Sequence, residues 1–255
     1  MFLDVVDLRN FYGGPLGGLV RKMLRAKLAE MWPKVGGDRV LGIGYATPLL
    51  RPFIGRAERV IGFMPARQGV VNWPWEGPSA TALIDETALP LPDSSVDRVL
   101  LVHTLEMADD PSEVLREIWR VMAPGGRLIC VVPNRIGLWA RLETTPFGYG
   151  LPFSQGQLDS LLKTTLFSPI DWRGALYMLP SSRPFAIRMA GALERFGART
   201  WPTLAGVLVV EATKQLYQGL PARSGNRLRA APIFRPALIR VAEDEAPELG
   251  HGRPT

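Results

Sequence analysis

The sequence predicts an α/β domain built on a doubly wound, mainly parallel sheet with an antiparallel strand at one edge. Between residues 39 and 132, short and almost continuously apolar runs alternate with segments of helical periodicity. This alternation is typical of a parallel sheet covered by helices on both faces. The chain has 255 residues, of which 47% are apolar, so it is long enough to bury a sizeable core as one domain.

The first predicted helix covers Gly17–Trp32. Its apolar residues recur at helical spacing, its basic residues stand mostly between them, and Pro33 and Gly36 end it. We expect this amphipathic helix to pack on the domain, although a basic amphipathic helix can also lie on a membrane surface. The ten residues at the start of the chain carry Asp4 and Asp7 and lack the apolar run of a signal peptide.

Strand and helix signals then alternate along the chain. Each predicted strand is a short apolar run, and each predicted helix has its apolar residues on one face. The strands are Arg39–Ile43, Arg59–Phe63, Thr81–Ile84, Val96–Val102 and Arg127–Val132, and the helices between them are Thr47–Ile54 and Pro111–Met122. We expect the first strand to be central in the sheet, and Val99, Leu101, Ile129 and Val131 to be buried.

The pattern loosens after residue 133. Gly137–Gly150 is predicted to be a long loop or lid. Ser154–Lys163 is predicted to be a helix, because Ser154 and Gln157 have the spacing of a capping box. A further helix, Pro184–Phe196, and a last strand, Ala205–Ala212, follow, and we expect this strand to be antiparallel at a sheet edge.

Composition excludes several kinds of protein. No apolar stretch reaches the roughly 18–20 residues that would span a bilayer. The only cysteine, Cys130, lies inside an apolar run, so it is expected to be a buried core residue in a reducing compartment, and the protein to be cytoplasmic. Two histidines and one cysteine, far apart in the sequence, do not form a metal-ligand pattern.

Positive charge is concentrated near the end of the chain. The formal net charge is +6, and residues 214–240 contain six basic residues and no acid among many prolines and glycines. We therefore divide the chain into a domain of residues 1–213 and a basic arm of residues 214–255. The arm is either a solvated segment lying over the domain or a contact for an acidic protein, an RNA or an anionic membrane surface.

The stretch Ala82–Asn134 carries a recognisable pattern. It contains an acid before a Leu-Pro turn (D-E-T-A-L-P-L-P), a strand with an early Asp (V-D-R-V-L-L-V), and a helix leading into Pro-Gly-Gly and another strand (A-P-G-G-R-L-I-C-V-V-P-N). In this order and spacing, it resembles the class I S-adenosylmethionine-dependent methyltransferases, in particular those with a methyltransferase type 11 domain. The resemblance implies a Rossmann-like fold and S-adenosylmethionine as the cofactor.

The resemblance assigns the cofactor loop to V-L-G-I-G-Y-A-T-P. Gly44 and Ala46 stand at the family's first two glycine positions, and Pro48 stands at the third. Bare backbone at such positions lets a nucleotide approach closely. Gly42 stands where the family has an acid that helps to hold the methionine end of the cofactor, so this contact is missing.

Two further cofactor contacts follow from the resemblance. Met64 stands where the family has an acid that binds the ribose hydroxyls, and its loss costs about 1–3 kcal/mol if those hydroxyls stay unpaired. Asp85 stands where an acid receives the exocyclic amine of adenine, with the backbone of Glu86 or Thr87 near the ring. The alternative for Asp85 is a turn residue that caps the loop before Leu89.

Other candidate residues lie at the carboxyl ends of later strands. His103 follows the fourth strand, where ligands of such folds bind, and it either lines the pocket and moves a proton or is a polar edge residue. Glu106 is a weaker candidate. In the loop after the fifth strand, Trp139, Arg141, Phe147 and Tyr149 are expected to form an aromatic, cationic mouth on the substrate side, or else simply to cover the core.

The sequence thus supports an S-adenosylmethionine-dependent methyltransferase with an unassigned acceptor. Methyl transfer depends mostly on positioning, so the absence of a triad or metal motif from the sequence is no objection. The two missing acids favour the alternative of a catalytically inactive, methyltransferase-like binding or regulatory module. An RNA-associated protein acting through the basic arm is a third possibility, although the sequence lacks a known RNA-stacking motif.

Overall fold

The computed structural model describes residues 3–216 of the chain. Its sheet has seven strands in the order β3-β2-β1-β4-β5-β7-β6. The strands are β1 (Arg39–Gly44), β2 (Arg59–Pro65), β3 (Thr81–Ile84), β4 (Val96–Val102), β5 (Met122–Pro133), β6 (Phe167–Ala175) and β7 (Val207–Lys214). The predicted first strand lies inside the sheet, between β2 and β4, in parallel register with both.

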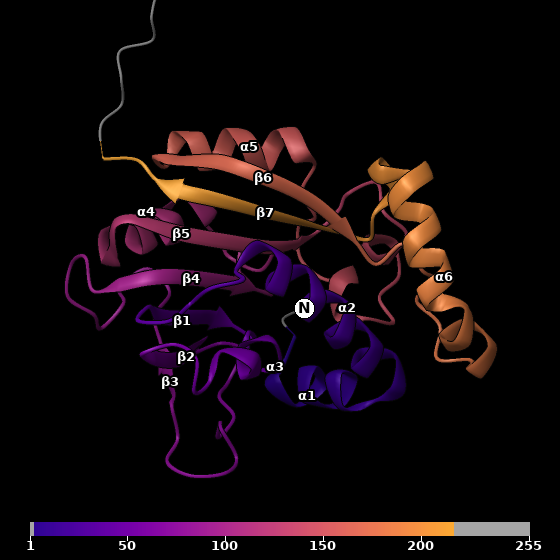
Figure 1. Ribbon diagram of the computed structural model, residues 1–255, viewed down its shortest axis with the longest axis horizontal. Coiled ribbons are helices and arrows are strands. Elements are labelled where there is room, and N and C mark those ends of the chain that lie inside the picture. Colours follow the sequence, from indigo (N-terminus) through magenta and orange to yellow (C-terminus); the bar gives the residue numbers. More distant parts are fainter. Residues whose placement is uncertain (1–2, 217–255) are drawn as a thin grey trace, which may run out of the picture. The chain divides into compact units, whose positions relative to one another are not determined.

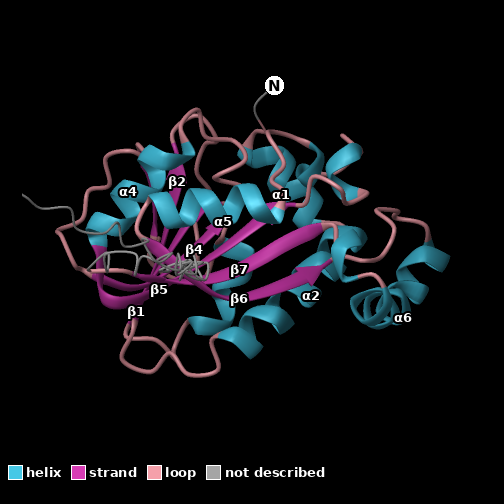
Figure 2. Cartoon of the chain, turned by 90° about the horizontal axis from the view of Figure 1, so that it is seen from above, coloured by secondary structure: helices cyan, strands magenta, loops and turns pink. Residues whose placement is uncertain are grey.

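Helices cover both faces of this sheet. They are α1 (Val5–Gly13), α2 (Pro15–Met31), α3 (Thr47–Leu50), α4 (Pro111–Val121), α5 (Gln155–Thr164) and α6 (Pro184–Thr200). Figure 2 shows α4 and α5 on one side of the sheet and α2 on the other. Alternate residues of each strand therefore enter different cores: Val99 and Leu101 pack with α4 and α5, whereas Ile129 and Val131 pack with α1, α2 and α3.

The core predictions are confirmed. Val99, Leu101, Ile129 and Val131 are each at most 1% exposed. Cys130 is fully buried, and burial raises the pKa of its thiol. The capping box is confirmed as well, since Ser154 Oγ accepts a hydrogen bond from Gln157 N and Gln157 Oε1 accepts one from Ser154 N.

The predicted antiparallel strand lies near one edge of the sheet, as expected, and a second antiparallel strand lies outside it. The predicted last strand is β7, which runs antiparallel to both of its neighbours, β5 and β6. The edge itself is formed by β6, which the sequence did not predict. Pro169, Asp171 and Gly174 interrupt the apolar pattern of β6, and most of its residues are half-buried.

The amino-terminal region contains a helix that the sequence did not predict. Helix α1 begins after Asp4, whose carboxylate accepts a hydrogen bond from Val6 N at 3.0 Å. It runs directly into α2, the predicted amphipathic helix, which packs on the domain as expected. The two helices cross so closely that a Cβ on Gly17 would lie 2.0 Å from Phe11 O. Figure 1 shows α1 and α2 lying next to each other.

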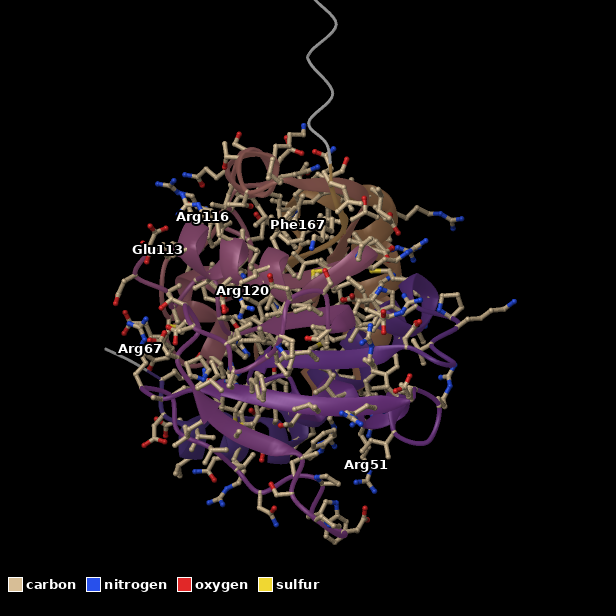
Figure 3. All side chains as sticks on the ribbon, turned by 90° about the vertical axis from the view of Figure 1, so that its left-hand side faces the viewer. Arg51, Arg67, Glu113, Arg116, Arg120 and Phe167 are labelled. Carbon is tan, nitrogen blue, oxygen red and sulfur yellow. The ribbon has the colours of Figure 1, made fainter. Side chains whose placement is uncertain are left out.

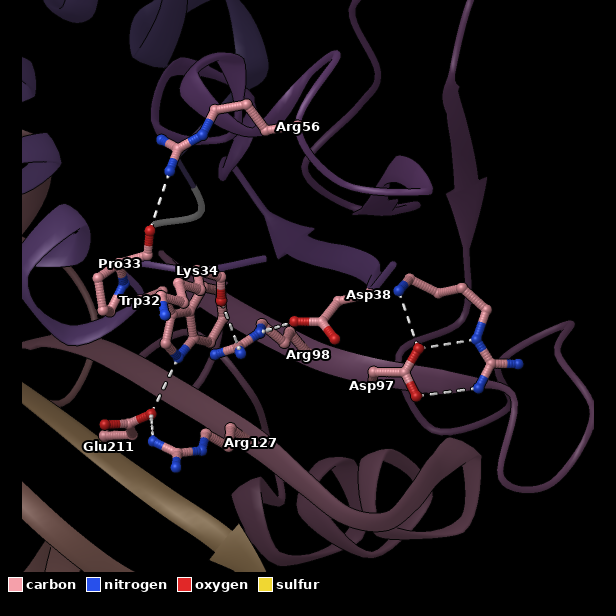
Figure 4. A network of polar contacts seen from close by, with 10 residues as sticks. Trp32, Pro33, Lys34, Asp38, Arg56, Asp97, Arg98, Arg127 and Glu211 are labelled. Carbon is pink, nitrogen blue, oxygen red and sulfur yellow. Dashed lines mark hydrogen bonds and ion pairs between the residues drawn. The ribbon is translucent and has the colours of Figure 1, made fainter. Parts of the chain in front are cut away.

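Ion pairs hold together the opposite end of the sheet, where β1, β4 and β5 begin. Figure 4 shows Asp97 of β4 joined to Arg39 of β1, and Arg98 joined to Asp38. In the same region Glu211 of β7 accepts hydrogen bonds from Trp32 Nε1 at 3.0 Å and from Arg127 at 3.1 Å. These contacts hold the amino-terminal ends of β1, β4 and β5 together. The candidate ligand site lies at the opposite, carboxyl ends of the parallel strands.

Candidate functional site

The predicted cofactor loop lies at the carboxyl end of β1, and its glycines serve the packing of the fold. Gly44 has φ +78°, and a Cβ there would lie 2.2 Å from Val102 O and 2.3 Å from Thr104 Oγ1. A Cβ on Gly42 would lie 2.5 Å from a methyl carbon of Leu50 and 2.7 Å from the Cβ of Ala46. Position 42 therefore has no room for an acid, because α3 packs directly against it.

The end of β2 differs from the family pattern in a second way. Met64 is fully buried in the core. A few residues later, the Arg67 guanidinium pairs with Glu86 at 2.6 Å and with Asp109 at 2.7 Å. Arg67 thereby connects the loops that follow β2, β3 and β4, which sequence reasoning did not foresee.

These three loops enclose an outer cavity of about 390 Å³. Asp85, Glu86 and Thr87 line one side of it, Ala108, Asp109 and Asp110 line another, and Arg67 and Glu113 complete the rim. Figure 3 shows Arg67 and Glu113 on this side of the molecule. The cavity lies at the carboxyl edge of the sheet, where folds of this class bind ligands.

Asp85 is exposed in this cavity. Its Oδ1 accepts hydrogen bonds from Thr87 N at 2.9 Å and Thr87 Oγ1 at 2.7 Å, and these bonds hold the pKa of the carboxyl below its usual range. The carboxylate therefore stays ionised and fixed in direction. The turn-capping interpretation of Asp85 is correct, and the same capping leaves the side chain in the lining of the cavity.

An inner cavity lies next to the outer one, between the ends of β2 and β4. Its volume is only about 20 Å³, which is room for little more than one water molecule. Leu3 lines it from the amino-terminal side, and Gln68, His103 and Thr104 line it from the sheet. Val5 N donates a hydrogen bond to Gln68 O at 2.8 Å, so the start of α1 is anchored here.

His103 is the centre of a buried polar cluster beside the inner cavity. Its φ of +54° is rare for a non-glycine residue. The Tyr12 hydroxyl lies 3.0 Å from Nε2, and Glu106 Oε1 lies 3.3 Å from Nδ1. Burial raises the pKa of Tyr12 well above its ordinary value, so the phenol keeps its proton. The tautomer of His103 decides whether the phenol donates to Nε2 or accepts from it.

Several atoms of this cluster have their hydrogen-bonding capacity unused. Within residues 3–216, both carboxylate oxygens of Glu106, Nδ1 of His103 and Oε1 of Gln68 are buried without a hydrogen-bond partner. The 3.3 Å approach of Glu106 to His103 thus has the distance of an ion pair but not the geometry of a hydrogen bond. Buried polar atoms of this kind are costly unless paired, so the cluster can bind a polar group.

The two cavities differ in how well they fit S-adenosylmethionine. The outer cavity has the size of a small-molecule site and presents Asp85 and Glu86, so it fits the adenine end. The inner region, where the ribose and methionine parts belong by resemblance, does not fit them while Leu3 and α1 stay in place. Met64 and Gly42 also offer no carboxylate there.

The predicted aromatic mouth does not form. Trp139 and Phe147 are at most 1% exposed. The Trp139 indole donates to Met178 O at 2.8 Å, and the Phe147 ring packs on His103 with centroids 4.7 Å apart. Tyr149 is half-buried beside the same core, and Arg141 lines a different cavity near α6. These rings cover the core, because the loop folds inward through short 3₁₀ turns at Trp139–Arg141 and Pro146–Gly148.

Sequence reasoning missed Tyr12 and Gln68 as members of the site. The segment before Gly13 carries only a short helix signal, in which Val5, Leu8 and Tyr12 share one face after an Asp cap. Gln68 lies in a loop, and no local pattern marks it. Among residues 3–216, no group of three His, Cys, Asp or Glu side chains is placed to hold a metal ion, and no helix is long and apolar enough to cross a bilayer.

Part of the chain matches known proteins in sequence. Residues 41–130 match the model of the methyltransferase domain family. The chain is 36% identical over 105 residues to the ubiquinone/menaquinone biosynthesis C-methyltransferase of Acidiphilium cryptum, a match that covers 41% of this chain and 37% of that protein. The chain thus spans well under half the length of that relative.

Solved structures show the same fold. A methyltransferase from Archaeoglobus fulgidus that depends on S-adenosylmethionine matches with a TM-score of 0.55 and 19% identity, covering 81% of this chain and 97% of that one. The [4+2]-cyclase SpnF matches with a TM-score of 0.51 and 22% identity, covering 76% of this chain and 80% of that one. The class I methyltransferase fold is thereby confirmed. The cyclase shows that this fold alone does not fix a reaction.

Proposed function

We propose that this chain, whose residues 41–130 match the methyltransferase domain family, is an S-adenosylmethionine-dependent methyltransferase with an unassigned acceptor. One observation carries the proposal. Inside the matched segment, an open cavity of about 390 Å³ lies at the carboxyl edge of the sheet, with the ionised Asp85 in its lining. This is where the family's adenine-binding acid stands.

Asp85 and Glu86 would hold the adenine end, Asp85 through its carboxylate and Glu86 through its backbone. The bound cofactor supplies an electrophilic methyl group. His103 is the candidate base, in the tautomer whose Nε2 accepts from Tyr12. An acceptor hydroxyl or amine that replaced the Tyr12 hydroxyl would pass its proton to Nε2, and Glu106 would then stabilise the imidazolium.

A second candidate function is a binding or regulatory module without catalysis. The specific observation in its favour is the inner cavity of about 20 Å³, combined with Met64 and Gly42 at the positions of two cofactor-binding acids. The two candidates make different predictions for cofactor binding. A module that has lost the site binds no cofactor, whereas an enzyme binds it after the amino-terminal segment moves.

Two further parts of the proposal concern location and partners. The single, buried Cys130 supports a cytoplasmic location. The basic arm was predicted to begin at Lys214, but that residue ends β7, is 7% exposed and donates to Met122 O at 2.6 Å. The remainder of the arm, residues 217–255, lies outside the described residues, so its proposed contact with an acidic partner stays a prediction.

Calorimetric titration with S-adenosylmethionine and S-adenosylhomocysteine tests the proposal. Asp85→Ala removes the adenine contact, and we expect it to weaken binding about tenfold or more, since a hydrogen bond to a charged group is worth about 1.5–3 kcal/mol. Thr87→Ala is the matched control, because it removes the Thr87 hydroxyl bond to Asp85 but keeps the carboxylate. We expect this control to bind both ligands as the wild type does.

Two results would contradict the enzyme proposal. In the first, the wild type gives neither heat nor a thermal shift with either ligand at millimolar concentration, which would favour the non-catalytic module. In the second, both ligands bind but Asp85→Ala and Thr87→Ala weaken them equally. That outcome would mean that the turn, and not the carboxylate, supports binding.

A further inference from the structure

A separate cavity of about 280 Å³ lies between α1, α2, α3 and the loop that joins β2 to β3. Four arginines line it: Arg9 from α1, Arg21 and Arg25 from α2, and Arg51 just after α3. Figure 3 shows Arg51 on a different part of the surface from Arg67, which borders the outer cavity described above. This arginine pocket is therefore not part of the proposed adenine site.

The lining of the arginine pocket is positively charged, and an acid outside the lining pairs with one of its arginines. None of the described residues that line it is an Asp or a Glu. Glu76, outside the lining, pairs with Arg51 at 2.9 Å, and both of these side chains are exposed. Burial, followed by the nearby charges of Arg21 and Arg51, lowers the pKa of Arg25. The guanidinium groups are thus close enough to repel one another.

Two of these arginines are held in place by the backbone. Arg25 Nε donates to Pro48 O at 2.8 Å, and Arg21 donates to Tyr12 O at 3.4 Å. Each bond uses only part of a guanidinium, which has five N–H donors. The remaining donors keep a defined direction, because the helices that carry them are packed on the core. A fixed set of guanidinium donors is well suited to bind phosphate or carboxylate in a bidentate manner.

Aromatic rings form the other wall of the arginine pocket. Tyr45 and Trp73 are buried, Trp75 is exposed, and all three contribute to the lining. The Arg51 guanidinium lies 5.9 Å from the centroid of the Trp75 ring. Tyr45 in turn stacks on Tyr12, with centroids 5.5 Å apart. A flat or apolar group could pack against these rings while an anion is held by the arginines.

We propose that the arginine pocket binds a small phosphorylated molecule, with the phosphate on Arg9, Arg21, Arg25 and Arg51 and a compact aromatic or apolar group against Tyr45 and Trp73. The volume of about 280 Å³ is near the lower end of small-molecule sites, about 300 Å³, so the ligand has to be compact. The proposal does not depend on methyl transfer.

A ligand bound in the arginine pocket would also affect the buried polar cluster around His103. Tyr12 lines the pocket, and its hydroxyl bonds to His103. A ligand that shifts the Tyr12 ring therefore changes the hydrogen bond at Nε2. The pocket and the cluster share this one side chain as a common wall.

Calorimetry at low salt with phenyl phosphate and inorganic phosphate tests the proposal on the full chain. We expect both probes to bind, and phenyl phosphate to bind more tightly because of the ring wall. Arg9→Gln combined with Arg21→Gln should weaken both probes about tenfold or more, because two charged hydrogen-bond donors are lost. Lys22→Gln is the control: it removes one positive charge from the exposed position next to Arg21 in α2 and should change affinity less than about twofold.

A second variant keeps the proposal testable if the arginine variant does not fold. Asn72→Asp adds one negative charge to an exposed lining residue, keeps all four arginines, and should weaken both probes. Three results would overturn the proposal. They are no binding of either probe at millimolar concentration, equal weakening by Lys22→Gln and the arginine variant, and binding of phosphatidylglycerol vesicles without binding of the free probes, which would assign the arginines to a lipid surface.

Discussion

The hydroxyl of Tyr12 reaches Nε2 of His103 across 91 residues of sequence, and this contact is central to the site at the scale of single residues. Both side chains are at most 2% exposed. The Tyr12 ring also packs edge-on against His103, with centroids 5.9 Å apart. The pair thus combines ring packing with one buried hydrogen bond, and the two contributions can be separated by mutation.

Tyr12→Phe keeps the ring and removes the hydroxyl, which leaves Nε2 of His103 buried without its partner. We expect the free energy of unfolding to fall by about 1–3 kcal/mol, measured by urea denaturation. Tyr149→Phe is the control, because this half-buried tyrosine should change stability by less than about 0.5 kcal/mol. An equal loss in both variants would contradict the importance of the Tyr12–His103 bond.

The residue scale also shows what a single sequence can and cannot predict. Asp85 and Glu86 were assigned from the resemblance to the methyltransferase family and His103 from its position after a strand, and the three residues line two neighbouring cavities. Tyr12 was not found, since nothing local connects it to residue 103. Trp139 and Phe147 were assigned to a mouth, but their direction depends on how the loop folds, and composition does not determine that.

Among elements, strands and helices with strong periodicity were predicted to within a few residues, and those with interrupted patterns were not. The limits of β3 and β4 match the prediction fully. Strand β6 was missed because Pro169 and Gly174 break its apolar run, and tertiary pairing with β7 overrides this local weakness. Helix α1 was missed because its nine residues are shorter than the window in which periodicity is convincing.

The ion pair between β1 and β4 gives a prediction about elements. Arg39 donates to Asp97 through its side chain and its backbone, and these bonds lower the pKa of Asp97 below its ordinary value of 3.8. A carboxyl whose pKa is lowered by folding stabilises the protein above its unfolded pKa, and this contribution is lost as the pH falls through the folded pKa. Figure 4 shows the pair tying the two strand starts together.

Asp97→Asn should therefore be less stable than the wild type at neutral pH, and this difference should shrink as the pH falls from about 5 to about 3. Arg39→Gln breaks the same pair from the other side and should show the same convergence. Thermal unfolding at a series of pH values measures both variants. A difference from the wild type that stays constant down to pH 3 would show that Asp97 acts through packing and not through its charge.

At the scale of the whole molecule, the amino-terminal segment lies where the deeper half of the proposed cofactor site would have to open. Leu3 lines the inner cavity, Val5 N is bonded to Gln68 O, and Leu8 is fully buried. If only a minor state with this segment displaced is competent to bind, the measured affinity is reduced by the fraction of that state. Cofactor binding must then act on α1, whose residues 5–13 lie outside the segment that matches the family.

Hydrogen exchange with and without S-adenosylhomocysteine tests this coupling. If the segment withdraws when the ligand enters, the amides of α1 should exchange faster in the complex, whereas those of β4 in the sheet interior should stay protected. Val5→Gly loosens the anchor beside Gln68 and leaves the outer cavity unchanged, so it should raise ligand affinity about threefold to tenfold by favouring the open state. Thr87→Ala, already the control for the adenine contact, should leave α1 exchange unaltered. Slower exchange of α1 in the complex, or weaker binding by a folded Val5→Gly variant, would show that the segment is a wall of the ligand site and not an obstacle to it.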